Sequence, residues 1–168
     1  MAARSGSARS SKPRKGSTPP LSALDLGIDL GTTRTVVARA DRGNYPVLSF
    51  TDTNGDSHDY YPSLTALTDD GLVHGFRARR AARQGAPLLR SLKRTLAAPS
   101  VSAASPVALG DRTLGVGEVL VSFLTDLRQE LAASGVLDGA DPGGEDANVV
   151  VAVPAHAYGA QRLLTLDA

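Results

Sequence analysis

The sequence predicts one mixed α/β domain, and three segments of the 168-residue chain carry that prediction. Short strands with tight turns occupy residues 24–50, which favours an antiparallel meander. Apolar residues recur at spacings of three and four between 116 and 133, as on one face of an α-helix. The polar residues expected on the other face are Asp126, Arg128, Gln129 and Glu130. The apolar run 149–153 is typical of a central strand covered on both sides. We therefore expect a sheet with packed helices.

The first half of the chain consists of short strands separated by Gly, Asn, Asp and Pro. Five strands are predicted, at 24–30, 34–40, 46–50, 64–68 and 72–74. The first has the apolar character of a buried strand. Asp29 near its end is therefore expected to be a buried acid, which requires a cation or hydrogen-bond donors beside it.

The second half alternates helices with further strands. The sequence of this half predicts, in order, helices at about 76–84 and 88–97, a hairpin at 107–114, a helix at about 116–133, a strand at 149–153 and a helix from about 158. Residues 85–87 separate the first two helices, and Gly135 suits the exit of the long one. The last helix has no exit signal before Ala168, so we expect the chain to be a fragment of a larger α/β unit.

Composition removes several classes of site. The chain has no cysteine, which excludes disulfides, thiolate zinc sites and thiol nucleophiles. Its three histidines, His58, His74 and His156, lack metal-ligand spacing. No apolar run approaches the roughly 20 residues that span a bilayer, and no signal-peptide core follows the start. We expect a cytoplasmic protein that does not contact a membrane.

Charge is distributed unevenly, although the formal net charge is only +1. Residues 1–20 contain five basic and no acidic residues, and we expect residues 1–22 to be a disordered basic leader. The leader is either a tether for nucleic acid or an acidic membrane, or a solvated tail. Residues 71–110 carry seven positive charges and no acid. They form either a solvated face or an RNA-binding face. Because Phe76 alone is available for stacking there, we do not expect nucleic acid to bind.

The most informative motif is the segment Gly27-Ile-Asp-Leu-Gly-Thr-Thr-Arg-Thr35. An acid near the end of a strand, followed by glycine and two hydroxyl residues, is the arrangement of a turn that holds phosphates. Gly31 has no Cβ, so backbone N–H groups can approach an oxyanion, and Thr32 and Thr33 add hydroxyl donors. Asp29 can hold Mg²⁺ through the hydration shell of the ion. The same residues are also compatible with an ordinary hairpin turn.

This motif resembles the first phosphate motif of the actin-like ATPases, and among them most closely the seventy-kilodalton heat-shock chaperones (DnaK-like). Further segments resemble that family in the same order: 61–64 its TPS segment, 92–96 its IKRLIG segment, and 150–155 with 160–162 its VITVPAYFNDAQR stretch. The resemblance covers residues 24–168. Sugar kinases share the first motif, and the last stretch is what favours the chaperones.

The resemblance implies a fold, namely part of lobe I of an actin-like (ribonuclease H-like) ATPase domain. This lobe is a mixed sheet with packed helices and an inserted α+β subdomain. Its core would comprise 23–61 and 114–168, and the inserted subdomain 62–113. The second phosphate loop, the catalytic glutamate and the second lobe of the family have no counterpart in residues 1–168. We therefore expect this chain alone neither to hydrolyse ATP nor to bind it tightly.

The resemblance also implies roles for individual residues, with ATP and Mg²⁺ as cofactors. The residues that would line the β- and γ-phosphates are Gly31, Thr32, Thr33 and Arg34. Asp29 would lie near the hydration sphere of Mg²⁺, and Lys93 would be the catalytic lysine beside the γ-phosphate. Judged without the resemblance, Lys93 is a solvated lysine of the basic region. Pro154 and Arg162 would form the relay that communicates the nucleotide state to a substrate-binding domain.

For the complete protein, the resemblance implies an ATP-dependent molecular chaperone that couples hydrolysis to the binding and release of client polypeptides. Its partners would be unfolded clients and co-chaperones, namely a J-domain protein and a nucleotide exchange factor. The sequence departs from the family at Arg34, where Tyr or Asn is common, at 156–159, and at Leu166, where lysine is common. The alternatives are an actin-like-fold sugar or metabolite kinase, and a truncated relative without catalysis.

Overall fold

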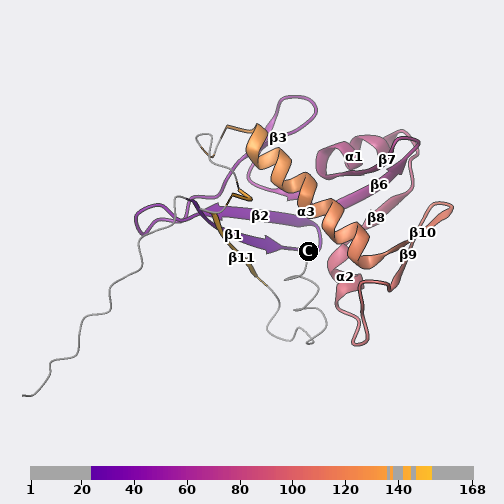
Figure 1. The fold of residues 1–168 in the computed structure, drawn as a ribbon. Helices are drawn as coiled ribbons and strands as arrows, with labels where there is room; N and C mark the ends of the chain where they lie inside the picture. The colour runs from indigo at the N-terminus through magenta and orange to yellow at the C-terminus, as the bar shows by residue number, and fades with distance from the viewer. Residues whose placement is uncertain (1–23, 136, 138–141, 145–146, 153–168) are drawn as a thin grey trace, which may run out of the picture.

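A computed structural model describes residues 24–135, 137, 142–144 and 147–152, which form sheets and three helices (Figure 1). The elements are β1 (Leu24–Leu30), β2 (Arg34–Arg39), β3 (Phe50–Thr51), β4 (Ser57–His58), β5 (Tyr61–Pro62), β6 (Leu64–Thr68), β7 (Gly71–His74), α1 (Gly75–Arg83), β8 (Leu88–Arg90), α2 (Leu92–Leu96), β9 (Pro106–Leu109), β10 (Arg112–Gly115), α3 (Val116–Ala133) and β11 (Ala147–Ala152). The predicted leader, the relay residues Pro154 and Arg162, and the last predicted helix lie outside the described residues.

The main sheet has the strand order β11-β1-β2-β5, with β1 antiparallel to β2 and parallel to β11. Every second residue of β1, from Leu24 to Leu30, is buried, because successive side chains of a strand point to opposite faces. The expectation that Asp29 is a buried acid is therefore wrong. Its side chain lies on the other face and is 65% exposed.

β11 confirms a strand at the predicted place but not its central position. In the described part of the chain it forms an edge of the main sheet, where Val149 and Val150 are 40% and 62% exposed. Val151 packs against the core. A run of apolar residues predicts a strand, but it does not distinguish a strand with two covered faces from one with a single covered face.

The third strand of the predicted meander is reduced to a bridge. Val47 pairs with Ala38, and Leu48 donates its N–H to the carbonyl oxygen of Val37 at 2.8 Å. Phe50 instead belongs to β3, which pairs with β4. Pro46 has no N–H to donate, which limits strand pairing at this position.

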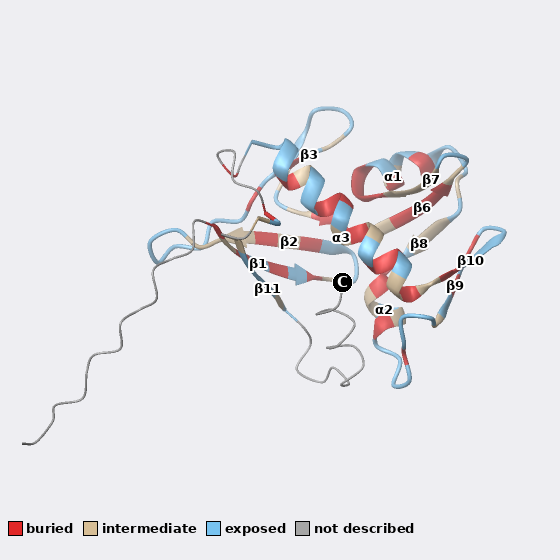
Figure 2. Cartoon of the chain, viewed as in Figure 1, coloured by how far each residue is buried: buried red, intermediate tan, exposed pale blue. Residues whose placement is uncertain are grey.

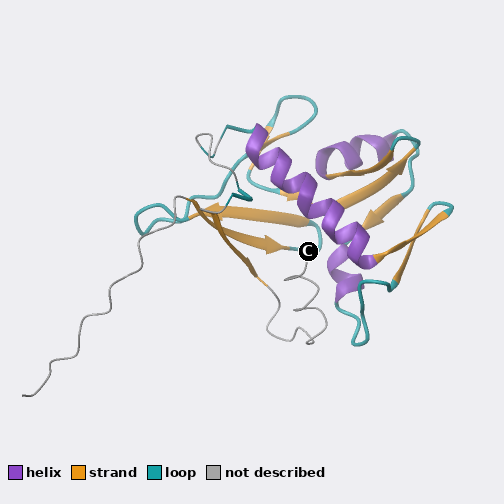
Figure 3. Cartoon of the chain, in the orientation of Figure 1, coloured by secondary structure: helices purple, strands orange, loops and turns teal. Residues whose placement is uncertain are grey.

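A second sheet, of order β7-β6-β8, is antiparallel, and α1 packs on it (Figures 1 and 3). β6 and β7 confirm two predicted strands, and β9 with β10 confirms the predicted hairpin. The prediction of a helix from residue 88 is wrong, because Leu88, Leu89 and Arg90 pair with β6 as β8. Pairing with an available strand edge outweighs the helix propensity of leucine.

α3 is the long helix predicted from the 116–133 periodicity, and its apolar face enters the main core (Figure 2). The buried apolar residues of this helix are Val116, Val119, Leu120, Phe123, Leu127 and Leu131. Gly135, with φ +71°, follows the last turn in the left-handed conformation that glycine favours. Among the helices of the described residues, none has the length and apolar character needed to cross a membrane.

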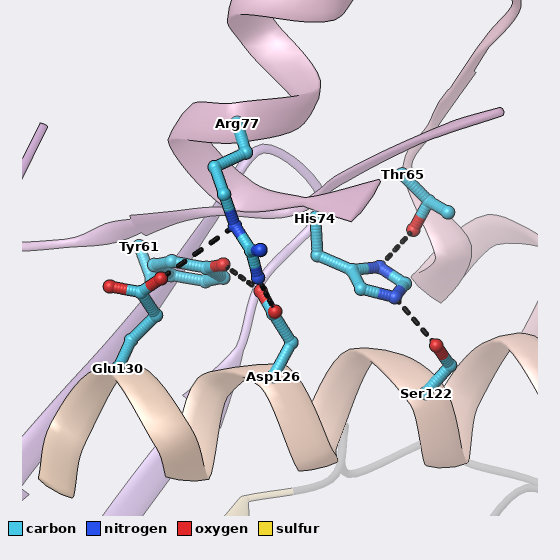
Figure 4. A network of polar contacts seen from close by, with 7 residues as sticks. All are labelled: Tyr61, Thr65, His74, Arg77, Ser122, Asp126 and Glu130. Carbon is cyan, nitrogen blue, oxygen red and sulfur yellow. Dashed lines mark hydrogen bonds and ion pairs between the residues drawn. The ribbon is translucent and has the colours of Figure 1, made fainter. Parts of the chain in front are cut away.

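One residue of α3 corrects the predicted division of its faces. Asp126, expected on the polar face, is 7% exposed and accepts hydrogen bonds from the Tyr61 hydroxyl and the Arg77 guanidinium (Figure 4). Burial raises the pKa of Tyr61, so the hydroxyl remains a donor. The Tyr61 ring leaves no room for a Cβ at Gly75, the first residue of α1. β5, α1 and α3 therefore meet at one carboxylate.

A second polar contact fixes α3 to the other sheet. The buried imidazole of His74 lies between Thr65 Oγ1, at 2.9 Å from Nδ1, and Ser122 Oγ, at 2.8 Å from Nε2 (Figure 4). Desolvation lowers the pKa of His74 to about 4, and the positive charge of Arg77 acts in the same direction. His74 is therefore a neutral structural residue at neutral pH.

Replacing Asp126 should destabilise the fold much more than replacing Glu130, one turn later on α3. Asp126→Ala leaves the buried Tyr61 hydroxyl without its acceptor, which should lower the free energy of unfolding by ~2–4 kcal/mol in urea denaturation. Glu130 contacts the same arginine at 3.8 Å but is partly exposed, so Glu130→Ala should cost under ~1 kcal/mol. Equal losses would contradict the structural role given to Asp126.

Stability should fall with acidification through the titration range of His74. The unfolded histidine binds a proton near pH 6.5, whereas the folded one binds it only near 4. Between these values the free energy of unfolding should decrease as pH falls, at up to ~1.4 kcal/mol per pH unit. The pKa of Asp52 is lowered chiefly by a hydrogen bond from the N–H of Asn54, so this residue changes the free energy of unfolding only below about pH 3.8. Urea titrations at several pH values should show a smaller slope for His74→Gln, and an unchanged slope would exclude His74 as the cause.

Candidate functional site

The turn between β1 and β2 presents a set of hydrogen-bond donors to solvent. Thr32 and Thr33 are exposed, and no described residue accepts a hydrogen bond from the backbone N–H of either. The N–H of Gly31, in contrast, is used within the turn, where it donates to the carbonyl oxygens of Asp29 and Arg34 at 3.0 and 3.1 Å. The donors available to a ligand are thus the amides and hydroxyls of the two threonines.

This turn is held in place by the segment that follows β5. Ser63 donates its N–H to the carbonyl oxygen of Thr33 at 3.1 Å, and its hydroxyl lies 3.0 Å from that of Thr35 in a buried contact. A Cβ at Gly31 would overlap the carbonyl oxygen of Arg34, so the turn requires glycine there. The supporting role of Ser63 and Thr35 is not evident from the motif alone, although Ser63 belongs to the TPS-like segment.

Lys93 and Asp29 lie next to each other although 64 positions separate them in sequence. The Lys93 ammonium nitrogen is 3.8 Å from Asp29 Oδ1, with Lys93 22% and Asp29 65% exposed. Asp29 is the last residue but one of β1, at the carboxyl end of the parallel pair β1–β11. Ligands of α/β sheets commonly bind at this end of the strands. The pair is partly solvated, so its two groups can separate at little cost.

The side chain of Lys93 is positioned by the burial of α2. Leu92 and Leu96 lie one helical turn apart, are 4% and 1% exposed, and insert into the main core. Lys93 follows the first of them and is therefore turned away from the core face. Ser91, just before the helix, has the left-handed dihedrals φ 66° and ψ 66°, through which the chain changes direction between β8 and α2.

Arg34 is occupied with an aromatic ring. Its guanidinium carbon lies 4.4 Å from the centroid of the Tyr60 ring, and Arg79 approaches the same ring at 5.9 Å. Arg79 also lies 3.4 Å from the Tyr60 hydroxyl. Cation–π contacts of this kind stabilise by ~0.5–1 kcal/mol at exposed sites. The side chain of Arg34 thus contacts Tyr60, and the donors that the turn presents to solvent are those of Thr32 and Thr33.

The donor set fits a phosphate group with a hydrated magnesium ion. The two threonines and Lys93 supply donors and positive charge, and Asp29 supplies one exposed carboxylate. Within the described residues no group of three or more His, Asp and Glu side chains could hold a metal ion directly. A single carboxylate is suited to Mg²⁺ that keeps several of its waters.

Comparison with curated proteins shows a distant similarity, and no family model matches the chain. The chain is 31% identical over 172 residues to the chaperone protein HscA homolog of Laribacter hongkongensis (strain HLHK9). The alignment covers 94% of this chain but 26% of the relative, so the chain spans about a quarter of the length of the protein it matches. This similarity links the chain distantly to a chaperone family, and it supports the chaperone resemblance in that coarse form.

Proposed function

We propose that this chain forms part of lobe I of an actin-like ATPase domain and binds the phosphates of MgATP at the turn between β1 and β2. In the longer protein that this proposal implies, ATP hydrolysis would drive the binding and release of client polypeptides, as in DnaK-like chaperones. The observation that carries the proposal is the 3.8 Å approach of Lys93 to Asp29 beside this turn. The similarity to a protein named as a chaperone favours this function over a sugar or metabolite kinase.

The residues of the turn would act by donating hydrogen bonds. The amides and hydroxyls of Thr32 and Thr33 would contact phosphate oxygens, which they can do without breaking any contact to a described residue. Asp29 would accept hydrogen bonds from the waters of Mg²⁺. The metal, when bound, supplies positive charge that neutralises the phosphates.

Lys93 would exchange one anionic partner for another. Its contact with Asp29 is long and half-solvated, so the ammonium can turn to a phosphate oxygen with little loss. A fixed positive charge at that point stabilises the negative charge that develops as the terminal phosphoryl group leaves. Asp29 is then available to the hydrated metal ion. The ion pair thus holds Lys93 and Asp29 beside the turn, where the first would meet a phosphate oxygen and the second the hydrated metal ion.

Titration with MgATP should perturb the turn but show weak affinity. In amide NMR spectra of the ¹⁵N-labelled chain, the signals of residues 31–33 should shift, with a Kd above about 100 µM, because one turn and one lysine supply few contacts. The double variant Thr32→Val/Thr33→Val should weaken binding severalfold, whereas Thr113→Val, an exposed threonine on β10, should not. Shifts that avoid the turn would refute the proposed site, and low-micromolar affinity would refute its partial character.

Lys93→Ala should discriminate between ATP and ADP. If the ammonium lies beside the terminal phosphate, the variant should lose about tenfold in affinity for MgATP, since a charge-assisted hydrogen bond is removed. Its affinity for MgADP should change by less than about twofold. Arg112→Ala, which removes an exposed positive charge on β10, is the control and should alter neither. Equal losses for both nucleotides would remove Lys93 from this role.

A further inference from the structure

A basic pocket of about 570 Å³ opens beside the turn, between α1, β8 and α2. Four arginines from these elements line it: Arg79, Arg83, Arg90 and Arg94. Thr32 and Thr33 line another part of its wall, and no lining residue is acidic. Among the described residues, no carboxylate forms an ion pair with any of the four guanidinium groups. The acid-free stretch 71–110 thus gathers its charges on a concave surface.

Ser91 gives this pocket a second feature. Its side-chain hydroxyl is buried, lines the pocket and has no hydrogen-bond partner among the described residues. The residue is 6% exposed and is held in the left-handed region, at φ 66°. A buried hydroxyl without a partner destabilises the fold, and backbone strain adds to that cost. Strain of this kind is concentrated at ligand sites, where a bound group supplies the missing partner.

The chemistry of the wall selects a small anion with several phosphoryl groups. Guanidinium groups bind phosphate through two parallel hydrogen bonds, and four of them match the charge of a condensed phosphate. The volume lies in the range of small-molecule pockets, about 300–1,000 Å³. No lining residue is aromatic, so the pocket offers no surface on which a nucleic-acid base would stack.

We propose that this pocket is a second anion site, which binds a multiply phosphorylated small molecule through Arg83, Arg90 and the Ser91 hydroxyl. It shares the two threonines of the turn with the proposed nucleotide site, but neither Lys93 nor Asp29 lines it. The charged groups of the pocket are therefore different from those of the proposed nucleotide site. This inference does not rest on the proposed function, although MgATP bound at the turn would compete for the two threonines.

Isothermal titration of the 168-residue chain with sodium tripolyphosphate, without divalent ions and at low salt, tests this site. We expect saturable micromolar binding at one site. The double variant Arg83→Gln/Arg90→Gln should weaken it at least tenfold, because each removes a charge-assisted contact. Ser91→Ala should weaken it roughly fivefold. Arg83 and Arg90 are exposed, and matching circular dichroism spectra and melting temperatures should show that the double variant folds.

Two further variants and one competitor complete the test. Arg80→Gln removes an exposed charge of the same helix that does not line this pocket, and it should change the affinity by less than about twofold. Lys93→Ala should also leave tripolyphosphate binding nearly unchanged. A loss of affinity with Arg80→Gln equal to that of the double variant would mean that diffuse electrostatic attraction holds tripolyphosphate. A similar loss with Lys93→Ala would mean that tripolyphosphate binds only at the nucleotide site. Either result would overturn the proposal, as would the absence of binding or preferential binding of a single-stranded RNA octamer through the same arginines.

Discussion

The contact of the Tyr61 hydroxyl and the Arg77 guanidinium with the buried carboxylate of Asp126 connects three elements that the chain supplies far apart. An unpaired carboxylate in the apolar face of α3 would be costly, so β5 and α1 must both reach that point. Tyr61 is followed two residues later by Ser63, whose N–H and hydroxyl hold the turn at Thr33 and Thr35. The position of the exposed donors therefore depends on a contact inside the core.

A similar dependence governs the charged pair of the candidate site. Asp29 lies on the exposed face of a strand whose other face is in the core, and Lys93 lies on a helix anchored by Leu92 and Leu96. Burial alone does not fix the position of either charged group. Their approach follows from the packing of the leucines beneath them, which holds two backbones in a fixed relation. The site is therefore as rigid as the core under it, whereas the 3.8 Å ion pair is free to exchange partners.

Strands β1, β2, β6, β7 and β11, the long helix and the hairpin could be predicted because each has a local signal in the sequence. These signals are apolar runs or alternation, a 3.6-residue period, and a turn between apolar residues. The errors concern properties that depend on partners distant in sequence. Residues 88–90 form β8 because β6 offers an edge, and Asp126 is buried because Tyr61 and Arg77 reach it. For Asp29, the alternation Leu-Asp-Leu-Gly-Ile-Asp-Leu already indicates one exposed face. The donors at Thr32 and Thr33 could be predicted because they follow the glycine of a turn between two strands, although the Gly31 amide itself is used within the turn.

Arg34 departs from the pattern of the family that the sequence resembles, and its side chain leaves the donors of the turn exposed. A positively charged side chain next to Thr33 could fold over the turn and compete with Lys93 for the same anion. Its guanidinium instead lies over Tyr60, on which Arg79 also packs. Two guanidinium groups on one ring repel each other, but both are partly solvated and the ring's negative faces offset part of this repulsion. The aromatic ring thereby keeps the Arg34 guanidinium away from the threonines of the turn, and it holds Arg79 at the wall of the basic pocket.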